Sequence, residues 1–108
     1  MQLLTEELRA AIPALYSQEK IEAKEKTVYA KFFFPAAEWT WFITEGEQEE
    51  NDYVFFGFVI GFAEEWGYFT LNDLKNINIQ LLTVERDLHF KPGKFGDVIM
   101  QFQKARGQ

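Results

Sequence analysis

Four side chains in the sequence are of the types that carry out acid and base chemistry. Glu64 and Glu65 stand next to Trp66, and a carboxyl group beside an aromatic wall can have a raised pKa. Asp87 and His89 lie two residues apart on an expected strand, so they point to the same side and permit a carboxylate and imidazole pair. These residues predict a small hydrolase or ligand-binding enzyme as one alternative. Against it, adjacent residues rarely face one site, and no seryl or cysteinyl nucleophile motif accompanies His89.

A run of carboxylates between residues 45 and 52 is the second candidate site. A calcium loop of the EF type needs Gly at its sixth position and Glu at its twelfth, and "EGEQEENDYVFF" has neither there. We therefore expect no metal and no cofactor. Two interpretations stay open, a solvated hairpin loop or a recognition loop for a basic partner. The candidate partner-binding residues of this run are Glu45, Glu47, Glu49, Glu50 and Asp52.

The net charge of −6 is unevenly distributed along the chain. No basic residue occurs between Lys31 and Lys75, and this interval holds nine of the 17 carboxylates. The remainder has 11 cations and 8 carboxylates, a balance of +3. An acidic interval repels phosphate backbones, because nucleic-acid affinity depends largely on cations that displace counterions. We therefore expect no direct nucleic-acid binding, and attraction to a basic protein surface instead.

Aromatic residues make up 18% of the chain, and fifteen of the 19 fall between Tyr29 and Phe69. Bases can stack on aromatic strand residues, but such platforms need flanking cations that this interval lacks. The bulk of these rings is expected to build the core of a small sheet. A partly exposed subset would instead form a protein-binding patch, since Trp and Tyr are favoured at interface centres. The candidates for that patch are Trp39, Trp41, Phe42 and Trp66, with Glu64 and Glu65 beside the last.

Helix and strand signals punctuate the chain. Thr5 predicts a helix start, and Pro13 predicts its end near Ala11 or Ile12. Thr70 with Asp73 predicts a second helix that begins at Leu71, and Asp97 predicts the cap of a last short helix. Residues 17–26 are expected to form an exposed connector. Apolar residues at period two or in a continuous run predict strands over 27–34, 38–44, 53–62 and 84–93.

The third of these strands contains Gly57 and Gly61, which lie on one face. Their missing side chains predict a bulge, a bend, or room for a ring such as that of Trp39 or Trp41. The fold class is α+β: a single domain over residues 1–108, with an antiparallel sheet of four to five strands and one to three helices packed on it. If helices and strands are segregated, the helices lie on one face.

The start of the chain, "MQLLTEELRAAIPALYS", lacks a basic region followed by an uninterrupted apolar stretch. It is therefore not typical of a secretory signal, and no stretch is apolar enough to span a membrane. The absence of cysteine excludes disulfides and thiolate nucleophiles. We expect a cytoplasmic protein with no membrane contact.

Four stretches carry a family resemblance: "LLTEELRAAIPALYSQE", "VYAKFFFPAAEWTWFITEG", "FFGFVIGFAEEWGYFTLNDL" and "VERDLHFKP". The chain resembles, over about residues 3 to 92, a family of small bacterial proteins of unknown function found largely on plasmids, integrative elements and phage-like regions. The tail after Pro92 fits less well. The resemblance implies a genomic context and supplies no catalytic residues.

The leading hypothesis is a non-catalytic protein-interaction module of a mobile genetic element. It would engage a basic host protein, such as a nucleic-acid-binding defence complex, through the acidic run and the neighbouring aromatic residues. An anti-defence inhibitor, anti-CRISPR or anti-restriction, is the form of this hypothesis that the genomic context implies.

Overall fold

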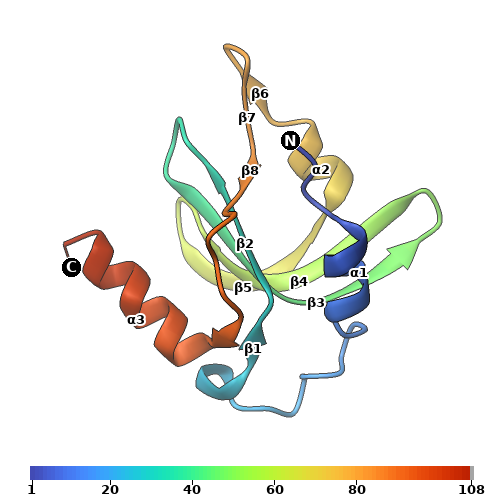
Figure 1. The fold of residues 1–108 in the computed structure, drawn as a ribbon, viewed down its shortest axis with the longest axis vertical. Helices are drawn as coiled ribbons and strands as arrows, with labels where there is room; N and C mark the ends of the chain where they lie inside the picture. The colour runs from blue at the N-terminus through green and yellow to red at the C-terminus, as the bar shows by residue number, and fades with distance from the viewer. Residues whose placement is uncertain (108) are drawn as a thin grey trace.

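A computed structural model describes residues 1–107 as one α+β domain built on a five-stranded antiparallel sheet (Figure 1). The strand order is β5-β4-β3-β2-β8, so β5 and β8 form the two edges. The predicted fold class is confirmed. The helices are α1 (Glu6–Ala11), the 3-10 helix η1 (Ala23–Glu25), α2 (Leu71–Lys75) and α3 (Phe95–Ala105). The strands are β1 (Thr27–Val28), β2 (Ala30–Phe34), β3 (Trp39–Glu49), β4 (Asp52–Ile60), β5 (Glu64–Thr70), β6 (Asn78–Ile79), β7 (Leu82–Thr83), β8 (Glu85–Arg86) and β9 (Gly93–Lys94).

The caps predicted for the first two helices are confirmed. The Thr5 side chain accepts from the backbone N–H of Leu8, and α1 ends before Pro13. Thr70 and Asp73 form a reciprocal capping box at the start of α2. The cap predicted for the last helix is wrong, because α3 begins at Phe95 and Asp97 lies in its first turn. The Phe95 N–H instead donates to the carbonyl of Lys26 at 2.8 Å, which ties the start of α3 to the connector.

The strand predictions are correct in place and wrong in extent. β3 continues to Glu49, so the predicted acidic loop is the end of a hairpin whose connection is only two residues long. β5 was not predicted as a strand, and the predicted strand over 84–93 is reduced to the two residues of β8. Figure 1 shows the β3–β4 hairpin end projecting on the right of the molecule, on the other side from α3.

A β-bulge interrupts the pairing of β3 with β4. Ile43 lies opposite Gly57, but Glu45 lies opposite Phe56, so Thr44 is an extra residue in β3. Because side chains alternate between faces, one inserted residue moves every later side chain of β3 to the other face. Trp39, Trp41 and Ile43 therefore share one face, and the odd-numbered residues that follow lie on the opposite one.

Each face of the sheet has its own apolar core. The larger core includes Phe32, Trp41 and Phe55, and α1 and α2 cover it through Leu8, Ile12 and Leu74. The smaller core forms on the other face, where α3 covers Phe42. The helices are thus found on both faces of the sheet and are not segregated to one. The members of the smaller core are Val28, Phe42, Ile60 and Phe95, with Phe58, Trp66, Phe90, Val98, Ile99 and Phe102 packed against them.

Gly57 in β4 and Gly61 directly after it allow other groups to approach the backbone closely. A Cβ at Gly61 would lie 2.4 Å from the ring of Trp39, which confirms the prediction that a large ring packs there. A Cβ at Gly57 would lie 1.9 Å from the backbone carbonyl oxygen of Phe42, next to the bulge. Only glycine permits this approach of two strands.

Among residues 1–107, no helix combines the length and the apolar character that crossing a membrane would require.

Gly57→Ala should reduce the free energy of unfolding by about 3 kcal/mol, because a methyl group there collides with backbone and not with a movable side chain. Gly67, directly opposite Gly57 on β5, is the matched control, since nothing lies within 4 Å of the position of its Cβ. Gly67→Ala should leave stability unchanged or raise it by up to about 1 kcal/mol. Urea unfolding followed by tryptophan fluorescence measures both, and equal losses would contradict the role assigned to Gly57.

Candidate functional site

The bulge at Thr44 decides where the carboxylates of β3 point. Past the bulge, Glu45 lies opposite Phe56, Glu47 opposite Val54 and Glu49 opposite Asp52. These three glutamates share the face that α3 covers elsewhere, which is the face of Phe56. Without the extra residue they would continue on the side of Trp39 and Trp41, toward the larger core.

Glu45 is a buried structural residue and not part of an exposed acidic loop. Its side chain is 2% exposed, and its two carboxylate oxygens accept from the backbone N–H groups of Tyr16 and Gln18, each at 2.8 Å. A buried carboxylate is stable only when such donors replace water. Glu45 therefore cannot present charge to a partner, and its removal from the recognition residues is a correction to the prediction.

Gln18 extends the network of Glu45 across the connector. Its side-chain amide donates to the carbonyls of Thr44 and Thr27, at 2.8 and 3.0 Å, and accepts from the Thr27 N–H at 2.7 Å. The Lys26 ammonium in turn donates to the Gln18 carbonyl. Gln18 is 6% and Lys26 8% exposed, whereas the other eight residues of the segment 17–26 are exposed as predicted. Gln18 ties this connector to the sheet.

Asp52 is also used within the fold. One of its oxygens accepts from the N–H groups of Tyr53 at 2.7 Å and Asn72 at 3.0 Å, which joins β4 to the first turn of α2. Desolvation raises the pKa of Asp52, but these two hydrogen bonds, the Thr70 side chain and the charge of Lys75 together outweigh it, so the net pKa is lowered. The carboxylate of Asp52 is therefore used mainly to hold the hairpin end against α2.

The carboxylates that remain available at the hairpin end are Glu47, Glu49 and Glu50, here called the acidic row. All three are exposed, and none takes part in the ion pairs found within residues 1–107. The nearby cation Arg9 is on α1, over the opposite face, where it donates to Gln48 at 2.7 Å. The acidic row thus carries unpaired negative charge on a two-stranded hairpin that the sheet holds in place.

A cavity of about 320 Å³ lies beside Glu45, on the face that Glu47 and Glu49 share. Phe56 stacks on Trp66 with ring centroids 5.9 Å apart and an interplanar angle of 16°, and it contacts Tyr68 at 4.8 Å. Tyr16, just before the connector, faces Tyr68 across the opening, with ring centroids 6.4 Å apart. We call these four residues, Tyr16, Phe56, Trp66 and Tyr68, the aromatic groove.

Three charged side chains also line this cavity. Glu45 lies at its buried side, and Lys26 places its ammonium 6.0 Å from the centre of the Trp66 ring. Glu19 is exposed at the edge. Desolvation, the Tyr16 hydroxyl and the negative charges of Glu45 and Glu19 together raise the pKa of Tyr68, so its hydroxyl stays neutral well above neutral pH.

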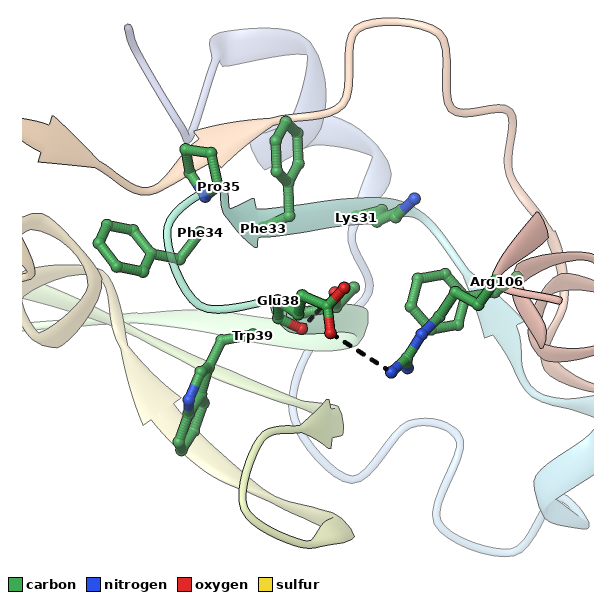
Figure 2. A pocket seen from close by; sticks show the side chains of 9 residues that line it. Lys31, Phe33, Phe34, Pro35, Glu38, Trp39 and Arg106 are labelled. Carbon is green, nitrogen blue, oxygen red and sulfur yellow. Dashed lines mark hydrogen bonds and ion pairs between the residues drawn. The ribbon is translucent and has the colours of Figure 1, made fainter. Parts of the chain in front are cut away.

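A second cavity, of about 250 Å³, lies near the C-terminal end of α3 (Figure 2). Arg106 forms a 3.9 Å ion pair with Glu38 across it, and the ring of Phe102 is 5.1 Å from both Arg106 and Lys31. Trp39 lines this cavity beside the β2–β3 turn. The register puts Trp39 at the end of β3 away from the acidic row, so the structure separates it from the carboxylates with which it was grouped.

The other predicted partner-binding residues are also dispersed. Trp41 is 4% exposed and belongs to the larger core, so it is not a surface anchor. Glu64 lies opposite Ile60 and Glu65 opposite Val59, which puts the two glutamates on opposite faces. The eight residue steps of β4 place them about 26 Å from the hairpin end. Of the predicted set, Trp66 and Glu45 are brought together, since both line the cavity described above.

The structure separates the two glutamates of the enzyme alternative from its other two residues, Asp87 and His89, which together line a cavity of about 330 Å³. Glu64 and Glu65 are on edge strand β5, whereas Asp87 and His89 follow β8 at the opposite edge of the sheet. Asp87 forms a 3.5 Å ion pair with Lys31. Its hydrogen bond with His89 is accepted from the backbone N–H and not from the imidazole, so Asp87 does not orient that ring. Within residues 1–107, no three His, Asp or Glu side chains cluster closely enough to hold a metal ion.

Sequence reasoning missed most of the aromatic groove. A usable signal existed in "EEWGYFT", where Trp66 and Tyr68 recur at period two and so share a face. For Tyr16 and Lys26 no local signal exists, because long-range bonds to Glu45 and Gln18 position them.

Comparisons with known proteins give one match. A family model described as "Protein of unknown function (DUF2958)" matches residues 3–106. The matched range is longer than the resemblance over 3–92 and includes nearly all of the segment after Pro92, with α3. Neither the curated proteins nor the solved structures give a significant match.

Glu45→Gln should reduce the free energy of unfolding by about 2 kcal/mol, because an amide nitrogen would face one of two buried backbone donors and the charge assistance would be lost. Glu47→Gln, an exposed glutamate two residues along the same strand, is the matched control and should change stability by less than about 0.5 kcal/mol. Chemical denaturation of both variants provides the measurement. Similar stability of the two variants would show that the bonds of Glu45 are not needed.

Proposed function

The chain belongs to the DUF2958 family of proteins of unknown function, and we propose that it is a non-catalytic protein-interaction module that engages a basic partner protein. The observation that carries this proposal is the unpaired negative charge of the acidic row on a rigid, projecting hairpin end, beside the aromatic groove. Glu47, Glu49 and Glu50 attract a basic surface at long range, and the rings supply apolar contact at short range.

The shape of the hairpin supports this function. β3 and β4 are paired from Thr40 to Glu49, so the acidic row needs no ordering when a partner arrives. The bulge and the buried Glu45 hold Glu47 and Glu49 on one face, and Asp52 ties the hairpin end to α2. A preformed charged surface of this kind raises the rate of association more than it slows dissociation.

The proposed partner is a nucleic-acid-binding complex, because proteins that bind phosphate backbones present basic surfaces. An acidic module seated on such a surface competes with nucleic acid for it. Within a mobile genetic element, this competition amounts to inhibition of a host defence complex, in keeping with the resemblance described above. The step to host defence draws on that genomic context, whereas the negative charge of the acidic row supports a basic partner independently of it.

Reversal of charge at two positions tests the proposal. The doubly substituted variant Glu47→Lys, Glu49→Lys changes the acidic row, and Glu64→Lys, Glu65→Lys is the matched control with the same change in net charge at the far end of β4. Proteins retained from a host lysate by the unmodified chain should also be retained by the control and be lost from the first variant, with association slowed about tenfold. Raising salt from about 50 to 300 mM should release them, since exposed charges are screened.

Equal retention by both variants, or loss from the Glu64 and Glu65 variant alone, would contradict the acidic row as the contact surface. Addition of nucleic acid to the captured complex distinguishes a partner that binds nucleic acid at the same surface from any other basic protein. Displacement of the chain supports competition at a nucleic-acid surface. A complex that persists limits the function to engagement of some other basic protein.

A further inference from the structure

The aromatic groove has the properties of a site for one large side chain. Its volume of about 320 Å³ is at the lower end of the range for ligand sites, and four of its eight lining residues are aromatic. Trp66 and Phe56 lie nearly parallel, with Tyr68 beside them and Tyr16 across the opening. Tyr16 and Tyr68 are 61% and 56% exposed, so two of the four rings are accessible from solvent.

The charges around the groove select a cation. Glu45 is bonded to two backbone donors, and Lys26 balances it through Gln18, so this pair leaves little net charge. Glu19 at the edge takes part in none of the ion pairs found within residues 1–107. A carboxylate beside the negative faces of aromatic rings favours a positive ligand.

The fold itself already places a cation against these rings. The ammonium of Lys26 is 6.0 Å from the centre of the Trp66 ring and donates to the Gln18 carbonyl at the buried side of the groove. The outer side, toward Tyr68 and Tyr16, has no such cation among residues 1–107. A planar, weakly hydrated guanidinium stacks on a ring more readily than an ammonium does, and it donates to carboxylates at the same time.

We infer that the aromatic groove binds an arginine side chain of a basic partner protein. The guanidinium stacks against Tyr68 and Trp66, and Glu19 at the edge accepts its N–H groups. This inference rests on the proposed function, since it names the side chain by which a basic partner is recognised. It also provides a property that can be measured without the partner.

The test uses short peptide amides of five arginine, five lysine or five citrulline residues as probes, with the full chain labelled for NMR. Pentaarginine should shift the signals of the Trp66 indole N–H and the backbone of Tyr16 and Tyr68 most strongly. Pentalysine should bind several-fold more weakly, and the uncharged pentacitrulline should not bind measurably. Shifts centred on Glu64, Glu65 or Phe62 would overturn the inference, as would equal affinity for pentaarginine and pentalysine.

Tyr68→Thr removes one accessible ring while keeping a strand-favouring residue, and it should weaken pentaarginine binding about three- to tenfold. Phe62→Ser is the matched control, since Phe62 is 98% exposed at the β4–β5 turn, and it should leave the affinity unchanged. Tyr16→Asn gives a second variant, because Asn tolerates the φ of 72° that Tyr16 adopts, and it should weaken binding similarly.

Comparison with the charge-reversed variant keeps the two proposals distinguishable. Binding of pentaarginine that falls with Glu47→Lys, Glu49→Lys but not with Tyr68→Thr or Tyr16→Asn would refute the groove and leave the acidic row as the contact. Binding that falls with the tyrosine variants but not with charge reversal would support the groove and count against the acidic row. Binding that none of these variants changes would refute both.

Discussion

The hydrogen bonds that the buried Glu45 carboxylate accepts from the Tyr16 and Gln18 backbones are the interaction on which the rest of this structure depends. They fasten a polar segment, which has few apolar residues of its own, to the surface of the sheet. Gln18 then satisfies backbone groups of Thr27 and Thr44, and Lys26 closes the network from the other side. A buried charge is tolerated here because every donor it needs comes from the segment it fixes.

The β-bulge at Thr44 makes that interaction possible. One extra residue in β3 lets the strand pass from the larger core, which Trp39 and Trp41 face, to the other side of the sheet, which Glu45 and Glu47 face. A strand of regular alternation with the same sequence would bury its glutamates among leucines and phenylalanines. The carboxylates and the aromatic groove share a face because of this single irregularity.

Local signals account for what the sequence predicts well. The caps at Thr5 and Thr70 involve residues three apart, and the closeness of Trp39 to Gly61 follows from an absent side chain. Gly57 indicates a bulge as one of three options, but the place of the bulge at Thr44 on the neighbouring strand could not be predicted, because it depends on the approach of the Phe42 backbone to Gly57. Strict alternation along β3 would put its tryptophans and its glutamates on the same face of the sheet. The structure puts them on opposite faces, because the bulge lies between them. The positions of Tyr16 and Lys26 beside the cavity depend on hydrogen-bond partners up to 29 residues away in the sequence.

The hydrogen bond from Phe95 to the Lys26 carbonyl has a mechanical consequence. The residue whose ammonium borders the groove also anchors the first turn of the C-terminal helix, so motion at either place is transmitted through one backbone unit. An occupant that stiffens the connector therefore also restrains the amide groups at the start of α3, where the ring of Phe95 itself packs against Trp66 with ring centroids 4.7 Å apart. Slower amide exchange at the start of α3 would therefore report occupancy of the groove.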